Sequence, residues 1–132
     1  MDIEEVAEWF KFADNDLFSA KILNDAVHRP YEIICYHCAQ AVEKYLKGYL
    51  IYCDIVPKKT HDLSFLNSIC IEKDEKFNNI QTLCDFLTTF ANDIRYPNQY
   101  EVAEDDVNFS ISAVEKVRDI KPISDLRNQI NQ

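Results

Sequence analysis

A single glycine, Gly48, occurs in this 132-residue chain, and this scarcity constrains the fold more than any other feature of the sequence. Four prolines accompany it, at positions 30, 57, 97 and 122. Glycine and proline are the residues that most often mark turns and that most weaken a helix. We therefore expect long helices joined by a small number of loops.

Hydrophobic periodicity predicts where these helices lie. From Ile3 to Ala20, apolar residues recur at alternating intervals of three and four, which is typical of one face of a helix over residues 3–25. A second helix over residues 31–53 carries two apolar stripes, so we expect it to be central and to contact two layers or a second subunit. Gly48 falls in its middle, which indicates close approach of another helix.

The second half of the chain predicts three further helices. We expect Thr60 to cap a short third helix, a charged turn at 72–76, a fourth helix over 77–94 and a fifth from about 103 to 121. Pro122 should end the fifth helix and leave a frayed polar tail. The predicted fold class is all-α: an up-and-down antiparallel four-helix bundle with an additional short helix, forming one domain over 1–121 with a tail at 122–132.

The net charge and the positions of the cysteines limit the classes of function that the sequence allows. A net charge of −9 weighs against general nucleic-acid binding and against anionic membranes, and no apolar run approaches the roughly 18–20 residues of a membrane span. The acidic N-terminus has no signal-peptide pattern, and five cysteines at apolar helical positions are typical of reduced thiols in a cytoplasmic protein. Cys35 and Cys38 flank His37 but lack a second ligand pair, so we expect no metal site. No cofactor motif is present.

Three segments carry polar residues that could bind an anion. Residues 37–47 place a polar strip on the second helix, residues 57–62 form a locally basic loop, and Arg95 ends the fourth helix. Each also has a simpler interpretation: a solvated helix face with a Glu43–Lys47 pair, a solvated turn, and an Arg that complements the helix dipole. Residue types alone leave both interpretations open.

The same segments resemble the HEPN domain family. The pattern W-x3-A-x2-DL-x2-A from Trp9 to Ala20 is similar to its first-helix signature, and CYHCAQAVEKYLK at 35–47 to its second-helix motif. KTHDL at 59–63 and RYP at 95–97 match the following loop and the end of the fourth helix. The order and spacing agree along the chain to about Ile120.

This resemblance implies a helical bundle that is usually a homodimer, in a family that includes the binding subunits of small nucleotidyltransferases and ribonuclease toxins. The ribonucleases use an Arg followed four to six residues later by a His, whereas all three histidines here precede Arg95. We therefore expect a non-catalytic subunit that binds a nucleotide or other phosphate-bearing ligand, or docks a small nucleotidyltransferase. The alternatives are an RNA-cleaving toxin with an altered site and a dimerisation or adaptor module. The predicted binding residues, expected to share one cleft, are Gln40, Glu43, Lys44, Lys47, His61 and Arg95.

Overall fold

The computed structural model describes residues 1–92 and 101–131, and within these residues it contains only helices and connecting segments. Six are α-helices and two, η1 and η2, are 3-10 helices. The elements in chain order are α1 (Ile3–Asn24), α2 (Tyr31–Tyr52), α3 (Leu63–Lys73), η1 (Glu75–Ile80), α4 (Gln81–Leu87), η2 (Thr88–Phe90), α5 (Glu104–Asp119) and α6 (Lys121–Ile130). The all-α prediction is confirmed.

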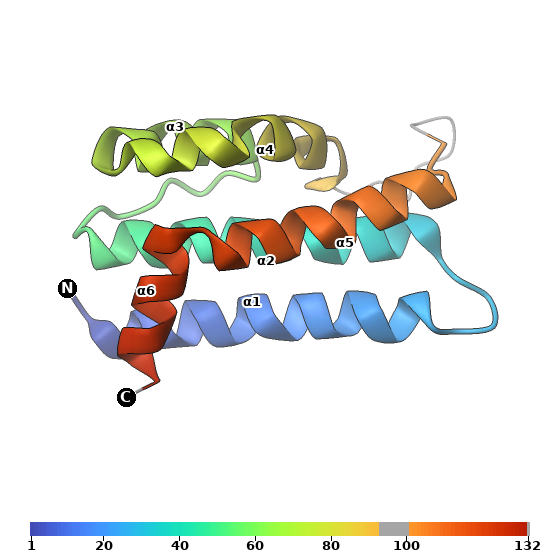
Figure 1. Cartoon of the computed structure of the whole chain (residues 1–132), viewed down its shortest axis with the longest axis horizontal. Helices are drawn as coiled ribbons and strands as arrows, with labels where there is room; N and C mark the ends of the chain where they lie inside the picture. The colour runs from blue at the N-terminus through green and yellow to red at the C-terminus, as the bar shows by residue number, and fades with distance from the viewer. Residues whose placement is uncertain (93–100, 132) are drawn as a thin grey trace.

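The helices are arranged around α2, which contacts all five other α-helices (Figure 1). The antiparallel helices α1 and α2 form a hairpin, α5 runs beside α2, and α3 with α4 forms a separate layer on the side of α2 away from α1. The predicted central position of the second helix is confirmed. No helix of the described chain is long and apolar enough to cross a membrane.

Helix α1 follows the predicted periodicity. The Asp2 side chain accepts hydrogen bonds from the backbone N–H groups of Glu4 and Glu5 and so caps the helix. The face that was predicted to be buried is almost completely buried at Val6, Phe10, Ala13, Leu17 and Ala20, but Ile3 in the first turn is 39% exposed. Burial of this face against α2 supplies most of the stability of such a helix, because propensity alone rarely does so in water.

Gly48 lies at a close approach of α1 and α2. A Cβ atom at this position would lie 2.8 Å from two ring carbons of Phe10 and 3.1 Å from the Cβ of Trp9. Distances this short are not tolerated without movement of the neighbouring atoms. The predicted reason for a glycine in mid-helix is therefore confirmed.

The structure differs from the sequence predictions in the second half of the chain. Asp62, not Thr60, caps α3, because its side chain accepts a hydrogen bond from the backbone N–H of Phe65. The predicted continuous fourth helix is divided into η1, α4 and η2 as far as Phe90. Its predicted end lies outside the described residues.

The predicted frayed tail is wrong for residues 122–130, which belong to α6 (Lys121–Ile130). Pro122 stands in the first turn of this helix, where its missing N–H has no intrahelical acceptor to lose. Ile123 and Leu126 are buried against the bundle. In Figure 1, α6 turns away from the end of α5 and crosses α2 and α1.

Candidate functional site

Five of the six predicted binding residues lie in one region, which we call the α2 polar face: Gln40, Glu43, Lys44, Lys47 and His61. The first four occupy two consecutive turns of α2. His61 reaches them from the loop between α2 and α3, which returns the chain along the second half of α2. Arg95, the sixth predicted residue, lies outside the described residues.

Glu43 is the centre of the first charged cluster on this face. Its Oε2 atom accepts a hydrogen bond from Lys47 Nζ at 2.9 Å, and its Oε1 atom lies 2.8 Å from His61 Nδ1. The Glu43 and Lys47 side chains are only 6% and 10% exposed, whereas His61 is 55% exposed. The i,i+4 pair is thus confirmed, but the interpretation of a solvated helix face is wrong for these two residues.

Asp16 of α1 is the centre of a second cluster beside the first. One carboxylate oxygen lies 2.9 Å from His37 Nδ1, and the other forms an ion pair with Lys44 Nζ. Sequence reasoning did not select Asp16 as a site residue, although it belongs to the first-helix pattern that carried the resemblance. Only the packing of α1 on α2 shows that this acid faces the lysine and the histidine.

The two clusters determine the electrostatics of the α2 polar face. Asp16 is paired with Lys44 and Glu43 with Lys47, so two carboxylates neutralise the two lysines. The Lys47 ammonium also lies 5.9 Å from the centre of the Trp9 ring, within the range of a cation–π interaction. The face is therefore an ordered array of paired charges rather than a groove of unpaired lysines.

A third cluster joins α6 to the hairpin on another side of α1. Both terminal nitrogens of Arg127 donate to the Asp14 carboxylate, at 2.9 and 2.6 Å, and one also donates to the Tyr45 hydroxyl at 3.1 Å. The Tyr45 hydroxyl in turn donates to Asp14 at 2.5 Å. None of these contacts was predicted, because Arg127 was placed in a frayed tail.

The third cluster shifts the pKa of its members. Burial acts to raise the pKa of Asp14, but hydrogen bonds from Arg127 and Tyr45, with the charges of Arg127 and Arg118, outweigh it and lower the pKa. Burial, together with the neighbouring Asp14, raises the pKa of Tyr45. Asp14 therefore stays ionised and Tyr45 stays protonated across the neutral range.

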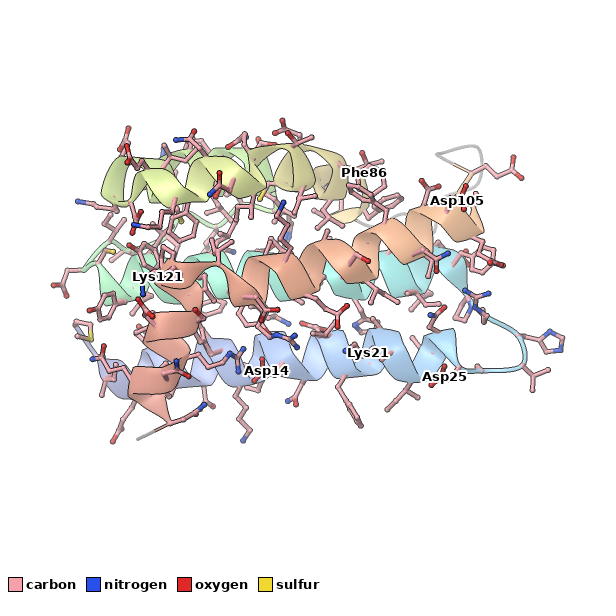
Figure 2. All side chains as sticks on the ribbon, in the orientation of Figure 1. Asp14, Lys21, Asp25, Phe86, Asp105 and Lys121 are labelled. Atoms are coloured by element: carbon pink, nitrogen blue, oxygen red, sulfur yellow. The ribbon has the colours of Figure 1, made fainter. Side chains whose placement is uncertain are left out.

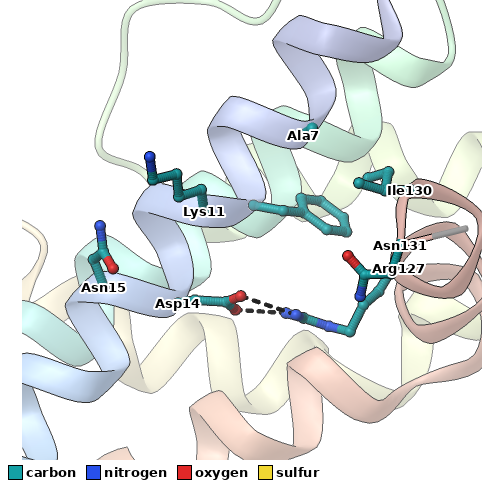
Figure 3. Close-up of a pocket in the computed structure, with 8 residues that line it drawn as sticks. Ala7, Lys11, Asp14, Asn15, Arg127, Ile130 and Asn131 are labelled. Carbon is teal, nitrogen blue, oxygen red and sulfur yellow. Dashed lines mark hydrogen bonds and ion pairs between the residues drawn. The ribbon is translucent and has the colours of Figure 1, made fainter.

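Two cavities adjoin the Asp14–Arg127 pair. The larger, of about 330 Å³, lies between α1 and α6 and is bounded by Phe10 and Ile130 (Figure 3). The smaller, of about 240 Å³, lies where α1, α5 and α6 meet and is lined by Asp14, Leu17, Phe18, Lys21, Arg118 and Arg127.

Cys35 and Cys38, the two cysteines that flank His37, lie in the interior of the bundle. Both are fully buried, and burial raises the pKa of the Cys35 thiol to about 11. Within residues 1–92 and 101–131, no group of three or more His, Cys, Asp or Glu side chains is placed to hold a metal ion. A buried thiol with a raised pKa is a poor nucleophile, so these cysteines are core residues.

Comparison with known families settles the relationship. The family model described as the HEPN domain matches residues 6–124, which is most of the chain. The chain belongs to the HEPN domain family. Among solved structures it is similar to ST0689, described as an archaeal HEPN homologue, with a TM-score of 0.68 and 24% identity over 95% of this chain and 97% of that one. No curated protein matches the sequence. At this identity the structural likeness shows the fold alone.

Proposed function

We propose that this HEPN protein is a binding subunit whose α2 polar face receives a nucleotide or another phosphate-bearing ligand, in company with a small nucleotidyltransferase. The observation that carries the proposal is the grouping of Lys44, Lys47 and His61 on one face, each positioned by a carboxylate. Side chains held in place lose less entropy on binding than free ones do. Ammonium and imidazolium groups are donors that suit phosphate oxygens.

The buried amide of Gln40 supports a ligand on this face. Its Nε2 atom is shielded from solvent and has no hydrogen-bond partner among the described residues. A buried donor without an acceptor is costly, so it is commonly satisfied by a ligand or a bound water. A phosphate oxygen beside Lys44 and Lys47 would be a suitable acceptor.

Calorimetric titration with AMP and ATP tests this proposal. We expect Lys44→Gln to weaken nucleotide binding about tenfold, since a charge-assisted hydrogen bond is worth roughly 1.5–3 kcal/mol. Lys116→Gln is the matched control, because Lys116 is an exposed lysine of α5 outside this face. Equal affinities for both variants would refute a specific role of this face.

The partner needs a separate test. A gene for a small nucleotidyltransferase beside the gene for this protein would identify the partner to examine. We expect the two chains to co-purify as a complex when they are co-expressed. Failure of such a neighbouring enzyme to associate at tens of micromolar would exclude this part of the proposal without affecting nucleotide binding.

A ribonuclease is the second candidate function, favoured by the geometry of His61. Glu43 holds its Nδ1 atom, and the half-exposed ring leaves Nε2 available as a general base. The test is degradation of RNA by the purified protein and its loss in His61→Ala and Arg95→Ala. Absence of cleavage by the unaltered protein would leave the binding subunit as the function.

A further inference from the structure

The 240 Å³ cavity where α1, α5 and α6 meet has a positively charged lining, although the chain as a whole is strongly acidic. Its lining includes three cations, Lys21, Arg118 and Arg127, each from a different helix, and one acid, Asp14. Figure 2 shows Asp14 and Lys21 on the part of α1 that lies beside α5 and α6. The formal charge of the lining is therefore positive in a chain whose net charge is −9.

The three cations differ in how much hydrogen-bonding capacity they have left. Arg127 already uses both terminal nitrogens on Asp14, and so it neutralises the only acid in the lining. Arg118 uses its Nε atom on Asp119 at 3.1 Å, and its two terminal nitrogens have no acceptor among the described residues. Lys21 contacts Glu115 at 3.0 Å with an ammonium that has three donors. Arg118 and Lys21 therefore retain donors for an added group.

The acids that partner these two cations do not close the cavity. Glu115 and Asp119 are 38% and 68% exposed and are not among the lining residues. Exposed ion pairs of this kind are worth little, so a stronger acceptor can compete for the same cations. A guanidinium with two free terminal nitrogens matches two oxygens of a phosphate in a bidentate arrangement.

Phe18 adds an apolar element at the mouth of the cavity. Its side chain lines the cavity, yet the residue is 65% exposed, which is unusual for a phenylalanine. An aromatic ring beside an anion-binding pair of cations can stack on a planar group attached to the anion. The lining therefore suits a phosphate joined to an aromatic ring better than a bare phosphate.

We propose that this cavity is a second anion site, separate from the α2 polar face, and that it binds a phosphomonoester carried by a planar aromatic group. Arg118 holds two phosphate oxygens, Lys21 contacts the third, and Phe18 packs on the ring. The Asp14–Arg127 pair forms the back of the site and places α6 so that the cavity exists. Asp14 and Asp16 project about 200° apart around α1, so the two anion sites lie on opposite sides of that helix.

Titration of the isotopically labelled protein with inorganic phosphate, AMP and adenosine, followed by amide NMR, tests the site. We expect saturable shifts on α1 near residues 14–21 and on α5 near 115–119, with AMP binding more tightly than phosphate. Adenosine should bind weakly or not at all, because it lacks the charge. Phosphate alone binding as tightly as AMP would overturn the role of Phe18.

Variants separate this site from the α2 polar face. Arg118→Gln should weaken AMP binding at the cavity about tenfold, and Phe18→Ala should weaken AMP while leaving phosphate unchanged. The control Lys116→Gln makes the same charge change two residues away on α5 and should change neither. A thermal melt establishes that each variant is folded. If shifts appear only on α2 and respond to Lys44→Gln but not to Arg118→Gln, the cavity proposal fails and the proposed function stands.

Discussion

At the scale of single residues, two neighbouring acids of α1 organise the polar contacts of the molecule. Asp14 binds Arg127 and Tyr45, which joins α6 to the hairpin, whereas Asp16 binds Lys44 and His37 of α2. Each carboxylate accepts from two partners, as its four lone-pair positions allow. Substitution of either acid therefore removes several contacts at once.

The Asp14→Asn substitution tests the first of these acids. At pH 7 we expect the free energy of unfolding to fall by about 1–2 kcal/mol, because the amide cannot replace a bidentate charge-assisted pair that is only partly buried. The folded-state pKa of Asp14 is lowered, so its stabilisation is complete above the ordinary value of 3.8 and is lost as the pH falls through the lowered value. The difference between the two proteins should therefore shrink in acid.

Urea denaturation at several pH values measures this difference. Lys121→Met is the control on α6, because it removes an exposed ion pair with Asp125 and should change stability by no more than about 0.5 kcal/mol. A difference between Asp14→Asn and the unaltered protein that persists well below the lowered pKa would show that something other than the ion pair is responsible.

At the scale of elements, α1 and α2 pack closely against each other at Gly48. In Gly48→Ala we expect overpacking against Phe10 and Trp9 to cost roughly 1–3 kcal/mol, while the better helix propensity of alanine returns about 1 kcal/mol. The net expectation is a loss of about 1 kcal/mol in unfolding free energy, measured in urea. Ser112→Ala, at an exposed position of α5, should be nearly neutral. A more stable Gly48→Ala protein would contradict the close approach.

The helices also show how much of the fold could be predicted from the sequence. The buried face of α1 and the central position of α2 follow from apolar spacing, because amphipathic helices must bury their stripes against one another. Helix α6 was missed because Pro122 was interpreted as a stop, although proline also starts helices. Ile123, Leu126 and Ile130 are spaced by three and four, which was the available signal.

The site was predictable to a smaller extent than the fold. The grouping of Lys44 with Lys47 follows from their spacing on one helix, and the loop length brings His61 near them. Their carboxylate partners and the buried state of Lys47 depend on how α1 and the loop pack. Arg127 joins Lys21 and Arg118 only through the path of α6, which no local pattern indicates.

At the scale of the whole molecule, large apolar side chains outside the cavity remain at the surface of α1, among them Phe12 and Ile22. Exposed apolar side chains of this size support the prediction of a homodimer. Sedimentation velocity at tens of micromolar should show a species of about twice the 15.5 kDa chain mass. A monomer throughout that range would contradict the prediction.

The placement of Asp14 and Asp16 also determines which sequence changes α1 can accept. The two acids face opposite sides of one turn. Each belongs to a different contact between helices, here called a seam: Asp14 pairs with Arg127 of α6, and Asp16 pairs with Lys44 of α2. Replacement of the exposed Asn15 between them leaves both seams in register. Deletion of Asn15 would rotate the rest of α1 by about 100° and shift it by about 1.5 Å, so that one seam could close only by opening the other. Position 15 is thus tolerant of substitution, whereas this turn of α1 is intolerant of any change in length.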